Sequence, residues 1–318
     1  MNVPFKNEAV HVLSVSGGKD STAMYLLALE SGVPFRAVFA DTGNENQITL
    51  DYIRDLQSKT GGPEIEWVKA DFSGDFKRKA EFIRQKWPED GVSPERVEQA
   101  ASMMHPHGSA FLDCCLMHGL FPGNKKMRFC SSDLKYYPID ALIDEILNAG
   151  NRVVSWVGVR AEESPSRAKL PEVEHEQDRG LTIFRPLLRW HLQDVIAIHA
   201  RHGIELNPLY QLGMLRVGCM PCINSSKGEL RVIAKRFPER IEMVKKWEDE
   251  VQKVSKSGKM MHFFRVDKTP LGEKTGDPSV ATIDHVVAWA NSGPGGDPRQ
   301  GTFDLDDHSC MSALGVCE

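Results

Sequence analysis

The first 70 residues alternate short apolar runs with segments whose apolar residues recur at helical spacing. The short runs predict buried strands at HVLSV (11–15), FRAVFA (35–40) and EIEWVKA (64–70). Between them, AMYLLALESG and ITLDYIRDLQSKTGG predict amphipathic helices that close on glycine. This alternation predicts a parallel sheet flanked by helices, with right-handed crossovers. The loops that leave the carboxyl ends of the strands then share one edge, where ligands bind in such folds.

The regular pattern fails between Trp87 and Arg128, where four prolines interrupt it. We therefore expect an irregular lid insertion at about 88–128. Regular pattern returns with a helix in YYPIDALIDEILNAG, a strand at 152–159, a further strand in LTIFRPL and a helix at 191–203. Two helical segments broken at Pro238 follow, and the tail from about Gly272 is rich in Gly, Pro and Asp and mostly irregular. We expect an α/β domain at 1–230 and a helical segment with an irregular carboxyl-terminal tail at 231–318.

The composition narrows the class of protein. With 41% hydrophobic and 26% charged residues, the chain is typical of globular proteins and unlike disordered, collagenous or disulfide-rich ones. No apolar run approaches the roughly 20 residues of a spanning helix, and the first residues lack a signal pattern, so we expect a cytoplasmic protein with no membrane partner. The net charge of -5 argues against a strongly basic protein, although a local patch can still bind nucleic acid.

The strongest local signal is the loop Ser16-Gly17-Gly18-Lys19-Asp20-Ser21-Thr22, placed between a predicted strand and a predicted helix. Its glycines let the backbone approach a ligand closely, and Ser21 and Thr22 lie where free N–H groups and the helix dipole favour phosphate oxygens. Lys19 adds a full positive charge. The spacing differs from that of a Walker A loop. The alternative is a plain strand-to-helix turn with a serine cap.

This loop resembles that of the PP-loop ATP pyrophosphatases, within the adenine nucleotide alpha-hydrolase-like superfamily, which has a Rossmann-like fold. Within that superfamily, four blocks are similar to the phosphoadenosine phosphosulfate reductase family: RFCSSDLKYYPI (128–139), WVGVRAEESPSRA (156–168), FRPLLRWHLQDV (184–195) and NPLYQLGMLRVGCMPC (207–222). The blocks occur in the order typical of the family. Together with the loop they span most of residues 11–230.

The resemblance implies that ATP or another adenylyl nucleotide lies along the strand ends. Asp41 is expected near the adenosine portion, with a turn-capping role as its alternative. Gly158 and Arg160 are expected near phosphate or sulfate, because glycine permits close approach and arginine offers a planar fork to oxyanions. Lys19, Asp20 and Arg160 are the candidate catalytic residues of the nucleotide site. Arg167 and Lys135 are equally well explained as ordinary surface charges.

The intact loop favours ATP as the nucleotide. In the reductases of the family that this chain resembles, which act on preformed phosphosulfate nucleotides, the loop looks degenerate, because no room for a β,γ-pyrophosphate is needed. Members with an intact loop resemble enzymes that adenylate an oxygen and let sulfur or nitrogen displace AMP. Mg²⁺ would neutralise the departing pyrophosphate. A nucleic-acid substrate and a sulfur-donor protein are the candidate partners.

The seven cysteines are an odd number in a chain expected to be cytoplasmic, so structural disulfides are not expected. Cys219 and Cys222 are spaced to converge on one metal. In the assimilatory adenylylsulfate reductases that this chain resembles, a double cysteine joins such a pair in binding a [4Fe-4S] cluster, but here Cys130 stands alone in that block, preceded by Phe129, which leaves a fourth ligand to be found. Cys310 is the expected fourth ligand, with Cys317, Cys114 and Cys115 as alternatives. A [4Fe-4S] cluster is preferred to zinc, and reduced thiols are the third alternative. His105, His107 and His118 could bind a metal, but histidines in irregular segments are more often solvated and receive no role.

Cys317, the penultimate residue, is a candidate nucleophile or persulfide carrier, and an exposed thiol without a role is its alternative. The favoured function is ATP cleavage to AMP and pyrophosphate that activates a substrate for sulfur transfer. One alternative is a phosphoadenylyl or adenylyl sulfate reductase that releases sulfite. The other is a nucleotide-binding component of a nucleoprotein or defence complex.

Overall fold

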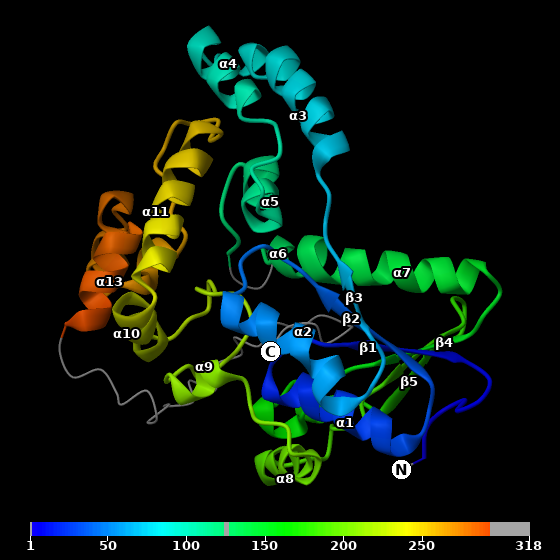
Figure 1. Ribbon diagram of the computed structural model, residues 1–318. Coiled ribbons are helices and arrows are strands. Elements are labelled where there is room, and N and C mark those ends of the chain that lie inside the picture. The colour runs from blue at the N-terminus through cyan, green and yellow to red at the C-terminus, as the bar shows by residue number, and fades with distance from the viewer. Residues whose placement is uncertain (1, 124–126, 293–318) are drawn as a thin grey trace.

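The computed structural model describes residues 2–123 and 127–292 and contains one six-stranded sheet (Figure 1). The strand order is β3-β2-β1-β4-β6-β5, and β5 alone runs antiparallel to its neighbour. The strands are β1 (Val10–Ser14), β2 (Phe35–Ala40), β3 (Ile65–Val68), β4 (Val153–Trp156), β5 (Val173–Glu176) and β6 (Leu181–Phe184). The predicted fold class, a mostly parallel sheet flanked by helices, is confirmed.

Helices cover both faces of this sheet. One face packs against α1 (Lys19–Ser31), α2 (Gln47–Thr60) and α8 (Leu192–His202), and the other against α7 (Tyr137–Asn148). On β1, Leu13 points into the first of these cores and Val12 into the second. Because successive side chains of a strand alternate between faces, a strand buried on both sides needs apolar residues throughout. This requirement explains why apolar residues predominate in the central strands.

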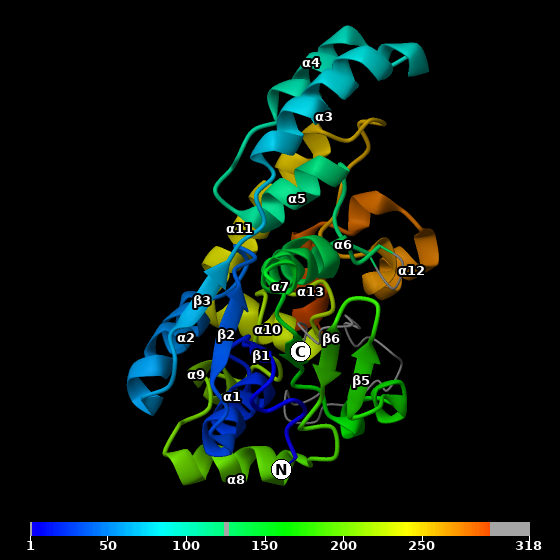
Figure 2. The same ribbon diagram turned by 90° about the vertical axis from the view of Figure 1, so that its right-hand side faces the viewer.

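A helical lobe rises away from the sheet (Figures 1 and 2). It comprises α3 (Ser73–Lys86), α4 (Pro94–Ser102), α5 (Ala110–His118), α10 (Lys227–Arg236), α11 (Pro238–Lys253) and α13 (Ile283–Asn291), with the short α12 (Pro270–Thr275) beside it. Aromatic rings join its parts, since Phe111 of α5 stacks on Trp247 of α11 with ring centroids 5.3 Å apart. The lobe therefore has its own hydrophobic core, drawn from both the expected lid and the carboxyl-terminal segment.

Four features differ from the expected pattern. The segment at 88–128 is not irregular, because it contains α4 and α5, and the tail beyond Gly272 contains α13. The prolines wrongly suggested irregular structure. Pro94 occupies the first turn of α4, where its missing N–H costs no hydrogen bond, and Ser93 caps that helix. The lobe core also crosses the expected boundary at residue 230. Strand β5 was not anticipated because its residues are largely polar, which an edge strand tolerates.

Four short segments lie near the pocket that is described below. They are α6 (Phe129–Ser131), a single π-helical turn at Ser132–Tyr136, α9 (Pro208–Gln211) and the loop that carries Cys219 and Cys222.

Among residues 2–123 and 127–292, no helix has the length and apolar character needed to cross a bilayer.

Candidate functional site

The loop between β1 and α1 is closed by its own serines. The Ser16 N–H donates to Ser21 Oγ (3.1 Å), and the Ser21 hydroxyl donates to the Gly18 carbonyl (3.2 Å). Gly17 has a φ of +77°, and a Cβ atom there would lie 2.9 Å from Thr49 Cγ2 of α2. A side chain at residue 17 would thus be both strained and crowded, which explains why glycine is needed at this turn.

Three side chains from a distant part of the chain brace the loop. Tyr210 accepts a hydrogen bond from the Lys19 N–H (3.1 Å), His199 Nε2 donates to the Lys19 carbonyl (2.9 Å), and Asn207 donates to the Gly17 carbonyl (3.2 Å). Sequence reasoning missed all three as functional residues. Asn207 and Tyr210 belong to the block at 207–222, so the only signal for them was its similarity to the family.

Asp20 and Arg160 form a buried ion pair beneath the loop. Both side chains are at most 5% exposed, Arg160 Nε donates to Asp20 Oδ1, and Lys19 Nζ lies 2.8 Å from Asp20 Oδ2. Arg160 also pairs with Glu162. The structure therefore brings together the three residues predicted as catalytic, but it uses Asp20 to hold two cations. Arg167, for which a surface role was an alternative, is buried and paired with Glu163.

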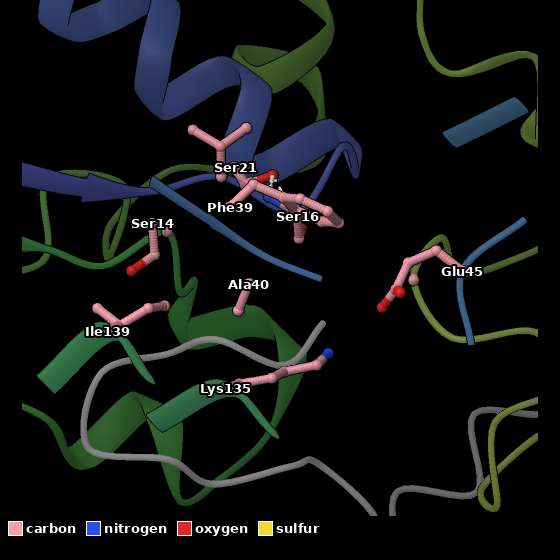
Figure 3. A pocket seen from close by; sticks show the side chains of 11 residues that line it. Ser14, Ser16, Ser21, Phe39, Ala40, Glu45, Lys135 and Ile139 are labelled. Atoms are coloured by element: carbon pink, nitrogen blue, oxygen red, sulfur yellow. Dashed lines mark hydrogen bonds between the residues drawn. The ribbon is translucent and has the colours of Figure 1, made fainter. Parts of the chain in front are cut away.

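A pocket opens over this loop at the carboxyl ends of β1, β2 and β4 (Figure 3). Chain order reverses between β1 and its neighbour β4, which is where ligands bind in open α/β sheets. The lining residues are Ser14, Val15, Ser16, Ser21, Phe39, Ala40, Glu45, Lys135, Ile139, Gly158 and Gly218. Gly158 approaches the start of α1 closely, since a Cβ atom there would lie 3.4 Å from Ser21 Cα. The predicted ligand edge thus holds the pocket.

Asp41 is not among the lining residues of this pocket. Its Oδ1 accepts the Gly43 N–H at 2.9 Å, which is the turn-capping bond of an Asx turn. This geometry matches the alternative weighed for Asp41, and its contact with adenosine stays a prediction.

Lys135 and Glu45 are two lining residues that sequence reasoning did not assign to the site; Lys135 lies opposite the loop, and Glu45 lies to one side of the pocket (Figure 3). Glu45 is buried and accepts hydrogen bonds from the Thr42 N–H (3.1 Å) and hydroxyl (2.6 Å). Burial by itself lowers the pKa of Lys135, but the negative forms of Cys219, Glu45, Cys222 and Cys130 raise that pKa above its usual value. Lys135 thus places a positive charge across the pocket from the loop.

Cys219, Cys222 and Cys130 all lie close enough to Lys135 to influence its pKa, but within the described part of the chain their sulfur atoms do not all lie within 4.8 Å of one another. Cys219 forms a β-bridge with Glu45, and its Sγ lies 3.5 Å from the Thr42 hydroxyl and 3.7 Å from Glu45 Oε1. Burial, with smaller effects from neighbouring charges, raises the pKa of Cys219 to about 12, and burial together with Cys222 raises that of Cys130 to about 11. Three sulfur donors from two segments suit a thiolate-bound metal group better than a hard cation. Cys310 and Cys317 lie outside the described residues.

Two further cysteines pack inside the lobe. Cys114 and Cys115 on α5 are fully buried, and desolvation first, then nearby negative groups including Cys130, raises the pKa of both thiols well above the ordinary value. Cys115 therefore behaves as a core residue of the lobe.

Comparisons with known proteins agree with this arrangement. The family model described as the phosphoadenosine phosphosulfate reductase domain matches residues 10–225. An uncharacterized 37.8 kDa protein of Escherichia phage 186 is 41% identical over 332 residues, covering 99% of this chain and 98% of that protein. An adenosine 5'-phosphosulfate reductase of Allochromatium vinosum is 32% identical over 131 residues, which are 40% of this chain and 47% of that protein. A phosphoadenylyl-sulfate reductase structure from Candida auris aligns over 67% of this chain and 82% of that chain, with a TM-score of 0.42 and 18% identity.

Proposed function

We propose that this chain, which belongs to the phosphoadenosine phosphosulfate reductase domain family, binds ATP and cleaves it between the α and β phosphates to activate a substrate for sulfur transfer. The observation that carries the proposal is the complete Ser16–Thr22 loop, which faces Lys135 across a pocket at the strand ends (Figure 3). A loop with two glycines, a helix start and a lysine suits the polyphosphate of ATP. A preformed phosphosulfate nucleotide has less need of such a loop.

In the proposed reaction, main-chain N–H groups at the start of α1 and the Lys19 ammonium hold the β and γ phosphates. A substrate oxygen attacks the α phosphorus, the bond to the α–β bridging oxygen breaks, and pyrophosphate leaves with that oxygen and its electron pair. Sulfur then displaces AMP from the adenylated substrate. Mg²⁺ bound with ATP supplies further charge neutralisation. No protein nucleophile is required for the first step.

Asp20 and Arg160 act in this proposal as positioning residues. Their buried pair fixes the first turn of α1 against the segment after β4, so that the loop is preorganised before nucleotide arrives. Lys135 contributes a second positive charge from the opposite wall, where it stabilises charge on the departing or transferred group.

The sulfur-handling half of the proposal is assigned to the cysteines beside the pocket. Cys130, Cys219 and Cys222 would hold a [4Fe-4S] cluster, with zinc as the less favoured group and Cys310 as the expected fourth ligand. Bound there, a cluster would supply an iron site able to bind or transfer sulfur. Nucleic acid is the proposed acceptor class, a sulfur-donor protein the proposed partner, and Cys317 a proposed carrier of persulfide.

The test is incubation of the full-length protein with ATP labelled at the α phosphate, in the presence of Mg²⁺ and candidate nucleic-acid acceptors. AMP and pyrophosphate are the expected products. Lys19→Ala should lower turnover by about tenfold or more, because a loop cation is lost, whereas Lys59→Ala, an exposed lysine on α2, should not. Release of ADP and orthophosphate without AMP would contradict the proposal.

A second candidate function is the reduction of adenylyl or phosphoadenylyl sulfate, favoured by the position of Cys219 close to pocket residue Glu45. This activity predicts thiol-dependent release of sulfite from either nucleotide. Cys317→Ser should abolish that release. Sulfite release together with no AMP from ATP would favour this second candidate.

A further inference from the structure

We propose that Cys114, His118 and Asp133 form a binding site for one divalent transition-metal ion, with zinc as the preferred ion. The site lies in the helical lobe and uses none of the residues assigned to the nucleotide. It also gives a function to His118, a residue that the sequence left without one.

The three donor atoms already converge. Cys114 Sγ, one ring nitrogen of His118 and one carboxylate oxygen of Asp133 all lie within 4.8 Å of one another. His118 Nε2 is 2.8 Å from Asp133 Oδ2, and Cys114 Sγ is 3.8 Å from that same oxygen. Cys114 and His118 are four residues apart on α5, which places both on one face of the helix.

Neighbouring groups hold two of the ligands in place. Asp133 Oδ1 accepts the Ser132 hydroxyl at 2.7 Å, which leaves Oδ2 for the shared position. The His118 ring stacks on Phe129 with centroids 3.8 Å apart. Groups of this kind, which orient ligands without touching the ion, are the usual support of protein metal sites. Asp133 itself lies in the π-helical turn, a rare conformation found frequently at functional sites.

The donor set selects the class of ion. A thiolate is a soft donor, an imidazole is intermediate and a carboxylate is hard; zinc accepts all three, whereas the sulfur and nitrogen donors disfavour magnesium or calcium. In a tetrahedral zinc site, bond lengths of about 2.0–2.3 Å separate the ligand atoms by roughly 3.4–3.6 Å. Metal binding would therefore require the His118–Asp133 pair to open from 2.8 Å by roughly 0.6 Å and the Cys114–Asp133 pair to close from 3.8 Å by roughly 0.2 Å. The His118 side chain is 40% exposed, which leaves a path of entry from solvent.

Such an ion would join α5 to the turn that carries Lys135. Asp133 lies two residues before this pocket lysine, and the π-helical turn continues directly into α7. Metal binding would therefore fix the wall of the pocket to the helical lobe. The ligands have a structural role in this proposal, so metal binding itself is the readout.

The experiment uses full-length protein in a Cys219→Ser background, which removes the competing thiolate site beside the pocket. Chelator-treated protein is titrated with Zn²⁺ and, separately, with Co²⁺, followed by metal analysis after gel filtration. We expect one retained equivalent of zinc and a sulfur-to-cobalt charge-transfer band. Adding His118→Ala or Asp133→Asn should weaken zinc binding by about tenfold or more. Adding Cys114→Ser should remove the charge-transfer band.

His105→Ala, which removes an exposed imidazole from the same lobe, is the matched control and should change neither readout. Circular dichroism verifies that each variant is folded, and the exposed His118 variant decides the matter where the buried Cys114 variant fails to fold. Undiminished zinc affinity in the folded His118→Ala protein would overturn the proposal. A cobalt complex without sulfur ligation would overturn it as well.

Discussion

The position of Asp20 in the phosphate-loop motif suggests a catalytic residue, but the side chain is buried in contacts with the protein itself. Its side chain has no exposed surface and accepts contacts from Lys19 and Arg160. Because each carboxylate oxygen of Asp20 already lies against a cation of the protein, the residue acts by holding the loop. The motif correctly indicated which residues gather at the site. It could not reveal that they satisfy one another, because Arg160 is 140 residues away along the chain.

At the same scale, Gly17→Ala tests crowding against Gly32→Ala. Both glycines have positive φ, but a Cβ atom at residue 17 meets Thr49 and Ile53, whereas nothing lies within 4 Å at residue 32. Gly32→Ala should lower the free energy of unfolding by about 1–2 kcal/mol, the cost of a left-handed alanine. Gly17→Ala should lower it by roughly 2–4 kcal/mol, because overpacking adds to that cost. Urea unfolding measures both, and equal losses would refute the crowding argument.

At the scale of elements, the sheet and the lobe helices α10 and α11, which meet at Pro238, were predictable, whereas α4 and α5 of the lobe were not. β1, β2, β3, β4 and β6 are short apolar runs bounded by turns, a pattern that buried parallel strands impose. The helices α4 and α5 lie among prolines, and each has only nine residues, too few for a helical spacing of apolar residues to stand out. Their stability comes from packing, as in the stacking of Phe111 on Trp247, which no local pattern encodes. Glu45, His199 and Tyr210 escaped prediction for a related reason, since only the fold brings them to the loop.

Glu248 on α11 is expected to make the lobe sensitive to pH. Its carboxylate accepts the N–H groups of Phe263 (3.0 Å) and Ile283 (3.1 Å), the latter at the start of α13, and burial raises its pKa from 4.5 to about 7. A carboxyl with a raised pKa in the folded state binds a proton more tightly there than in the unfolded chain. Its contribution to stability is therefore complete below about pH 4.5 and is lost as the pH rises to about 7.

The measurement is the free energy of unfolding between pH 4.5 and 8. In the native protein, Glu248 should make that free energy fall by roughly 3 kcal/mol across this interval. Glu248→Gln should flatten the fall, and Glu242→Gln, a change of an exposed carboxylate on the same helix, should preserve it. Identical pH profiles for the native and Glu248→Gln proteins would show that the carboxyl titrates normally.

At the scale of the whole molecule, one arginine of the lobe reaches the site. Arg240 of α11 donates to the Met220 carbonyl (2.7 Å) and, through Nη2, to the carbonyl (2.8 Å) and side-chain oxygen (2.7 Å) of Asn44. It therefore ties the cysteine loop to the segment that follows β2. The lobe and the pocket are thus mechanically linked through a few charged hydrogen bonds.

Removing this tie should expose the cysteine loop. Arg240→Ala is expected to speed alkylation of Cys219 by about tenfold or more, because hydrogen bonds from charged donors contribute roughly 1.5–3 kcal/mol. Mass spectrometry of iodoacetamide-treated protein gives the rate at each cysteine. Arg236→Ala, at an exposed position on α10, is the control. A Cys219 rate that is the same in both variants would mean that the loop is held by other contacts.

The π-helical turn Ser132–Tyr136 contains one residue more than an α-helical turn would need. One residue corresponds to about 100° of rotation about a helix axis. Deleting a residue there would convert the turn to ordinary α-helix and swing the preceding residues around the axis, while Ile139 and Ile143 kept their places against the sheet. Asp133 would then leave His118 even though both residues were retained. The number of residues in this turn, independently of their identity, sets the angular phase between the lobe and the pocket wall.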